Sequence, residues 1–147
     1  MKTILKLIPL IIVILFTSCS GNNGGGDPEP QTGFQEKLQG TWNLSSVTRN
    51  SDDTTTEFTG FTISFNTTNY SVTNGGTAWA EPSGSLTNFD AQNTGDTQQV
   101  YMGPQPVTLQ FSNDNKTLTM TYTIDNSTFG GGRAQSLAGN YVFVVTK

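Results

Sequence analysis

Residues 117–124 read Thr-Leu-Thr-Met-Thr-Tyr-Thr-Ile, and this stretch decides the fold. An apolar side chain follows every threonine, so the pattern repeats every two residues. Successive side chains of a β-strand point to opposite faces of its sheet. The stretch therefore predicts a strand with one buried and one solvated face, which is typical of antiparallel sheets.

Seven further segments carry shorter alternating runs, and turn-forming residues separate them. Asn74-Gly75-Gly76 is the strongest hairpin signal, and Pro82, which lacks a backbone donor, is typical of an edge strand. A glycine-rich loop, 125–139, precedes the last segment. In chain order, the eight expected strands are 41–49, 56–66, 70–74, 78–88, 98–102, 107–112, 117–124 and 141–146.

Hairpin spacing between these segments predicts an all-β fold, an antiparallel up-and-down meander of about eight strands. The last segment is apolar on both faces. Pairing it with the first would close the sheet into a barrel and leave no exposed edge. An immunoglobulin-like β-sandwich is the competing fold. Regular hairpin spacing without a long crossover favours the barrel, as a single domain over 38–147.

The chain opens with a basic and then an apolar segment. Lys2 and Lys6 precede a ten-residue apolar run, 7–16, which only Pro9 interrupts. A membrane-spanning helix needs about twenty apolar residues, so this run is too short and predicts a signal peptide over 1–18. Cys19, the only cysteine, follows directly.

Leu15-Phe16-Thr17-Ser18-Cys19 resembles the lipobox of bacterial lipoproteins. The resemblance implies that Cys19 becomes the first residue of the mature chain and carries acyl chains such as palmitate. Ser20 in the next position is similar to the pattern of lipoproteins sent to the outer membrane, which favours that membrane over the inner one. The expected location is therefore the cell envelope, with the membrane as partner through the lipid. The competing interpretation is an ordinary secretory signal.

Residues 19–37 follow as the lipidated cysteine and a tether. Glycine, asparagine, proline and glutamine dominate this segment, and such a composition cannot bury enough apolar surface to order itself. As a flexible coil it would span about 20 to 25 Å, roughly the diameter of a small domain. The domain is thus expected to stand clear of the bilayer.

Gly40-Thr41-Trp42 follows one expected helical turn, 34–39, and opens the first strand. A Gly-x-Trp motif in this position resembles that of the lipocalins. The resemblance implies an eight-stranded barrel in which Trp42 closes one end. We expect Trp42 to be a core residue that packs beneath Phe143 of the last strand.

Composition excludes several kinds of chemistry. The chain has no histidine, which removes the Ser-His and Cys-His nucleophile pairs and histidine-based zinc sites. Loss of 1–18 would leave five basic residues against eleven acidic ones, a formal charge of −6. The few basic residues are spread out, which disfavours nucleic acid. Aspartates in turn contexts are explained by backbone capping. We expect no enzyme activity, with catalysis by paired carboxylates as the open alternative, and no cofactor or metal site.

Candidate ligand-binding residues lie on two long loops, 90–99 and 125–139. We expect both loops at the barrel end away from Trp42, because mobile polar loops on a β scaffold commonly carry function. Gln98, Gln99 and Arg133 are the candidates, and Arg133 could fork onto a carboxylate or phosphate. In addition, Asp53-Thr54-Thr55 is similar to an O-glycosylation acceptor at Thr54, although an exposed polar loop explains the same residues.

Two functions remain open. The first is a monomeric, non-catalytic binding module for a small apolar or amphipathic ligand. The second is a structural or assembly lipoprotein that contacts another envelope protein or a glycan through its loops. The volume inside the barrel separates them, because an eight-stranded barrel is either filled by side chains or holds one small ligand.

Overall fold

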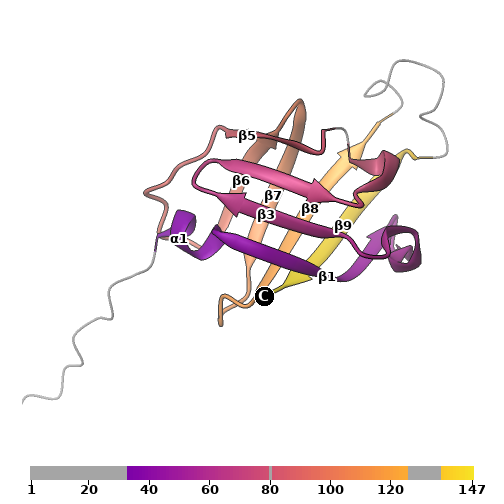
Figure 1. The fold of residues 1–147 in the computed structure, drawn as a ribbon, viewed down its shortest axis with the longest axis horizontal. Coiled ribbons are helices and arrows are strands. Elements are labelled where there is room, and N and C mark those ends of the chain that lie inside the picture. Colours follow the sequence, from indigo (N-terminus) through magenta and orange to yellow (C-terminus); the bar gives the residue numbers. More distant parts are fainter. Residues whose placement is uncertain (1–32, 80, 126–136) are drawn as a thin grey trace, which may run out of the picture.

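The protein is a closed antiparallel barrel of eight strands with one extra short strand (Figure 1). This computed structural model describes residues 33–79, 81–125 and 137–147. The signal peptide, Cys19 and Arg133 lie outside the described residues. The elements are α1 (Phe34–Leu38), β1 (Gly40–Arg49), β2 (Asp52–Asp53), η1 (Thr55–Phe58), β3 (Thr62–Asn66), β4 (Asn69–Thr73), η2 (Gly76–Ala78), β5 (Ser83–Thr87), β6 (Thr97–Met102), β7 (Gln105–Phe111), β8 (Thr117–Ile124) and β9 (Gly139–Thr146).

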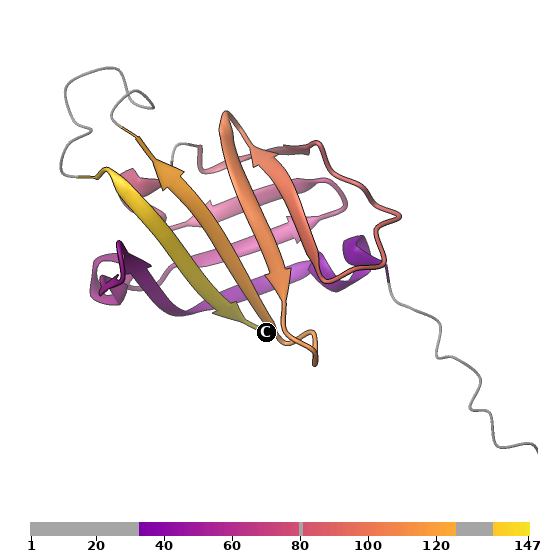
Figure 2. The same cartoon turned by 180° about the vertical axis from the view of Figure 1, so that it is seen from behind.

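Strand order confirms the predicted meander and rules out the sandwich. From β3 to β9 each strand pairs antiparallel with the next, and β9 pairs with β1 to close the barrel (Figure 2). β1 is long enough for two neighbours: Gly40–Asn43 pair with β3, and Asn43–Arg49 pair with β9. A bulge between Leu44 and Ser46 lies within the part that pairs with β9, just after the last pair with β3. Because a bulge bends its strand, β1 can bend away from β3 while it stays paired with β9.

β8 has the bounds that its sequence pattern predicts. Its apolar residues, Leu118, Met120, Tyr122 and Ile124, are all buried, while its threonines are exposed or partly exposed. The described chain contains no helix that is long and apolar enough to cross a membrane.

Two expected strands begin instead as short 3-10 helices. Residues 56–58 belong to η1, because the Thr55 N–H donates to the Asp53 carboxylate at 2.9 Å and tightens the chain before it can extend. Gly60, with φ of +76°, then separates η1 from β3. After Asn74 the chain likewise enters η2 rather than a tight hairpin, and β5 begins only at Ser83.

Trp42 and Phe143 are both fully buried, but they belong to different parts of the core. Phe143 lies opposite Val47, five residues along β1 from Trp42, which is about 16 Å in an extended strand. Trp42 instead packs against Phe111, with ring centroids 5.9 Å apart. The predicted packing of Trp42 beneath Phe143 is therefore wrong.

α1 covers the barrel end that contains Trp42. Phe34 and Leu38 are fully buried, so the folded domain begins before residue 38 and includes part of the segment assigned to the tether. The Trp42 indole donates to the Leu38 carbonyl at 2.9 Å. Lys147 donates to the Lys37 carbonyl at 2.6 Å and its Nζ lies 4.3 Å from the Trp42 ring centroid. These donors satisfy carbonyls that a helix end leaves unpaired.

Candidate binding site

The described residues that anchor the two expected binding loops lie at opposite ends of the barrel. Asp96, in loop 90–99, forms an ion pair of 2.7 Å with Lys37 of α1. Loop 125–139 ends at Gly139, next to Asn140, whose N–H donates to Asn50 at 2.9 Å, beyond the far end of β1. Successive connections in an up-and-down meander alternate between ends, and an odd number of strands separates these two loops. The expectation of a shared mouth is therefore wrong.

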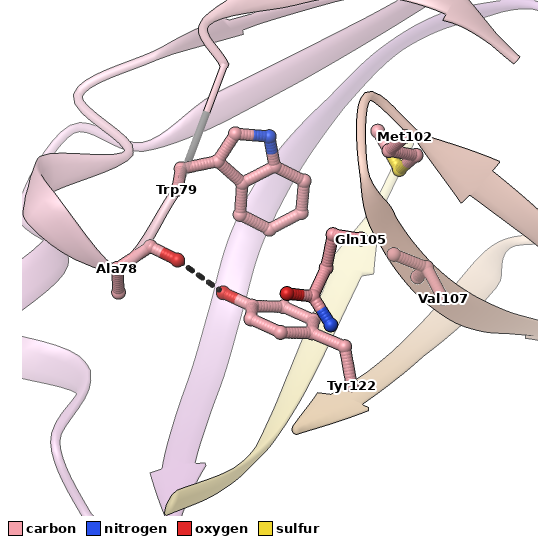
Figure 3. Close-up of a pocket in the computed structure, with 6 residues that line it drawn as sticks. All are labelled: Ala78, Trp79, Met102, Gln105, Val107 and Tyr122. Carbon is pink, nitrogen blue, oxygen red and sulfur yellow. Dashed lines mark hydrogen bonds between the residues drawn. The ribbon is translucent and has the colours of Figure 1, made fainter. Parts of the chain in front are cut away.

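A hollow opens at the end away from α1. β6 begins directly after Asp96, which pairs with α1, and runs to the turn that joins it to β7. The hollow lies at that turn (Figure 3). Its empty volume is about 210 Å³, open solvent at its mouth included. We call it the Trp79 hollow; its lining residues are Ala78, Trp79, Met102, Gln105, Val107 and Tyr122.

Aromatic side chains fill the barrel beneath the Trp79 hollow. Trp79 is partly buried and packs edge-to-face on Tyr122 and Phe143, at centroid distances of 5.2 and 5.4 Å. Tyr122 in turn stacks on Tyr141 at 5.5 Å. Edge-to-face and stacked pairs are the favourable arrangements of aromatic rings. The hollow therefore has a rigid aromatic floor and does not continue through the barrel.

Gln105 contributes a buried amide to the hollow, with 9% of the residue exposed. Its Nε2 donates to the Thr123 carbonyl at 2.9 Å. Since that carbonyl can only accept, the amide nitrogen must face β8, and the orientation of the side chain is fixed. No described group donates to the Gln105 Oε1.

Tyr122 contributes a hydroxyl that is already committed as a donor. It donates to the Ala78 carbonyl at 3.3 Å (Figure 3). Burial raises the pKa of Tyr122 well above its ordinary value, with a smaller contribution from Tyr141. The group therefore stays a neutral hydroxyl, and its oxygen can still accept a hydrogen bond.

A carboxylate lies at the rim next to the hollow. Glu81 packs against Gly103, in the turn between β6 and β7, so closely that a Cβ there would lie 2.6 Å from the Glu81 Oε2. Gly103 also has φ of +61°, a conformation that favours glycine. The six lining residues themselves carry no charge. The rim is thus acidic and the interior of the hollow is neutral.

The structure separates the predicted site residues. Gln98 faces the barrel interior and its Oε1 has no partner among the described residues, whereas Gln99 is exposed. Gln98 lies four residues from Met102 along β6, which is about 13 Å. Most of β6 therefore separates Gln98 from the hollow.

The sequence interpretation missed Gln105, Trp79 and Tyr122 as site residues. A signal for Gln105 was present, because it stands at the first inward position of the alternation Gln105-Val107-Leu109-Phe111. A polar residue in a series of buried apolar ones is informative.

Thr54, the predicted glycosylation site, is only 6% exposed. Its hydroxyl lies 3.5 Å from the Val47 carbonyl, to which it donates. Its backbone N–H also donates to Val47, at 2.9 Å. A glycan on this oxygen does not fit the folded domain, so the structure argues against that prediction.

Within the described ranges, no three histidine, cysteine, aspartate or glutamate side chains lie together as metal ligands could. The arrangement can bind a small group between an aromatic wall and two acceptor oxygens. No protein family, curated protein or solved structure matches the chain.

Proposed function

We propose that the chain is a lipid-anchored envelope lipoprotein whose lipocalin-like barrel is a non-catalytic binding module. Its ligand is small and apolar or amphipathic, and it binds in the Trp79 hollow. The observation that carries this proposal is the combination of a partly exposed tryptophan with a buried, oriented amide, Gln105, in one concave site. Apolar walls with a few fixed polar groups are characteristic of small-molecule sites.

The size of the hollow limits the ligand. Sites for drug-sized molecules have volumes of about 300 to 1,000 Å³, whereas the cavity inside the Trp79 hollow has about 10 Å³, which is room for a group the size of one water molecule. The aromatic floor formed by Tyr122 prevents deeper entry. The ligand is therefore a very small molecule or the end of a longer one whose remainder stays outside.

A second candidate function rests on the filled interior of the barrel. Aromatic packing from Trp79 to Tyr141 fills this part of the described core with side chains. A filled barrel suits a structural or assembly lipoprotein that contacts an envelope protein or glycan through its loops. This candidate needs no small ligand.

Native mass spectrometry of the full-length protein, released from membranes in mild detergent, separates the two functions. The binding module is expected to carry a small molecule that Trp79→Ala loses. Tyr101→Ala is the matched control, because Tyr101 is an aromatic residue of β6 that is 41% exposed on the outside of the barrel. No bound molecule in the wild type, together with cross-linking of the barrel to one envelope protein in cells, would favour the second function.

The lipid anchor is tested separately with Cys19→Ala. This variant is expected to leave the membrane fraction while the barrel stays folded, because the tether separates Cys19 from the domain. Density-gradient separation of the two membranes then tests the outer-membrane location. Unchanged membrane association of Cys19→Ala would contradict the anchor without affecting the binding proposal.

A further inference from the structure

We infer that the Trp79 hollow selects its ligand by a hydrogen-bond-donating head group, a hydroxyl or an ammonium, and rejects carboxylates. This inference rests on the proposed binding function and names the chemistry of its ligand. Its basis is that Gln105 and Tyr122 offer acceptor oxygens to a ligand, and that each is fixed in this role by a bond to the protein's own backbone. The Trp79 indole N–H, a donor in the same lining, lies on the side of its ring away from both oxygens (Figure 3).

Gln105 supplies the first acceptor. Its amide nitrogen is held by the Thr123 carbonyl at 2.9 Å, and the Pro106 carbonyl lies 3.4 Å from the same nitrogen. In Figure 3 the amide oxygen lies on the side of the Tyr122 hydroxyl, and the amide nitrogen lies toward the other end of the tyrosine ring. An amide flip would set two carbonyl oxygens against each other, so the oxygen cannot exchange places with the donor. Gln105 therefore presents an acceptor to a ligand.

Tyr122 supplies the second acceptor. Its only proton points to the Ala78 carbonyl, so the hydroxyl oxygen offers a lone pair and no donor. A hydroxyl or ammonium group between Gln105 and Tyr122 could donate to both. A carboxylate in the same place would meet two oxygens and no donor, which leaves a desolvated anion unpaired at a large cost.

The walls determine what the head group is attached to. Trp79, Met102 and Val107 form apolar surface beside the two acceptors. A short alkyl or ring segment would lie against them, because burial of apolar surface contributes about 25 cal/mol per Å². The ligand is thus amphipathic, with its polar end inward.

Charge around the hollow acts in the same direction. No lining residue is cationic, and Glu81 places a carboxylate at the rim beside Gly103. An approaching anion is repelled by this carboxylate, while an ammonium is attracted by it. Electrostatics and hydrogen bonding therefore favour the same class of ligand.

Four probes test the inference: hexanol, hexylamine and hexanoate, which share one apolar tail, and toluene, which has no polar head. The full-length protein in detergent is titrated while the indole N–H signals of its two tryptophans are followed by NMR. Trp79 reports on the hollow, and Trp42, buried at the other end, is the internal reference. Hexanol, hexylamine or both are expected to shift the Trp79 signal at concentrations at least tenfold below any effect of hexanoate.

Gln105→Met tests the acceptor, since methionine has a similar length and no strong acceptor. The tenfold preference is expected to disappear while toluene still binds. Gln99→Met, an exposed position of the neighbouring strand, is the control and should keep the preference. Hexanoate binding as tightly as hexanol, or a preference unchanged in Gln105→Met, would overturn the inference while leaving the binding function intact. If no probe, toluene included, shifts Trp79, the proposed binding function fails as well.

Discussion

Two buried tyrosines differ in whether their hydroxyl has a hydrogen-bond partner. Removal of each hydroxyl therefore provides a matched test of hydrogen bonding in the barrel. Tyr70 is 3% exposed and Tyr122 is 4% exposed. The Tyr122 hydroxyl donates to the Ala78 carbonyl, whereas the Tyr70 hydroxyl has no partner among the described residues. The variants are Tyr70→Phe and Tyr122→Phe, which keep the ring and delete one oxygen.

The two variants are expected to change stability in opposite directions. A buried hydroxyl without a partner costs about 1 to 3 kcal/mol, so Tyr70→Phe should raise the free energy of unfolding by about 1 kcal/mol. Tyr122→Phe loses a hydrogen bond worth about 1 kcal/mol and leaves the Ala78 carbonyl without that donor, so it should lower this free energy by about 1 to 2 kcal/mol. The variants should therefore differ by about 2 to 3 kcal/mol.

Urea denaturation of both variants and the wild type, under identical conditions, measures this difference. The slope of free energy against urea should be the same in all three, because neither change alters the surface exposed on unfolding. A Tyr70→Phe protein that is less stable than the wild type by more than about 0.5 kcal/mol would show that its hydroxyl has a partner. Equal losses in the two variants would refute the reasoning, since both hydroxyls would then be bonded.

Three further predictions concern stability. Trp42→Ala should lower the free energy of unfolding by about 3 to 5 kcal/mol in urea denaturation, and partly exposed Trp79→Ala by clearly less, because only Trp42 is fully buried. Lys147→Met should speed hydrogen exchange at the α1 amides, measured by NMR, since it removes the donor to the Lys37 carbonyl. The Asp114 carboxylate accepts from Ser112 at 2.5 Å and from the Lys116 N–H at 3.1 Å, bonds that lower its pKa below 3.8. The ionised Asp114 carboxylate therefore stabilises the folded state above pH 3.8, and this stabilisation is lost as the pH falls through the lowered pKa of the folded state. Asp114→Asn lacks this carboxylate, so its urea midpoint should fall less on acidification than that of the wild type.

The fold was predictable because the pairing pattern is local. β8 alternates threonine and apolar residues over its full length of eight residues, so its bounds follow from the sequence alone. η1 was not predictable from alternation. Its threonine-rich sequence suits a strand, and the hydrogen bond from Thr55 to Asp53 that starts the 3-10 turn depends on how the preceding hairpin places the two residues.

The candidate site was less predictable than the fold. Strand counting alone would have placed loops 90–99 and 125–139 at opposite ends, so this error came from grouping residues by composition instead of by topology. Gln105 was missed because Pro104 and Pro106 flank it, and proline is uncommon within a strand. The structure keeps Pro106 opposite Tyr101, at the hairpin end of β7.

The two ends of the barrel differ in how their backbone carbonyls are bonded, and this difference supports the proposed site. At the α1 end the fold supplies donors to the carbonyls at the end of the helix: the Trp42 indole bonds to Leu38, and Lys147 bonds to Lys37 and Gln39. At the other end Gln105 and Tyr122 donate to backbone carbonyls, and their side-chain oxygens remain available as acceptors. An oxygen of this kind is stabilised when a group donates to it. A ligand with a donor head group would therefore complete at the open end the hydrogen bonding that Trp42 and Lys147 complete at the covered one.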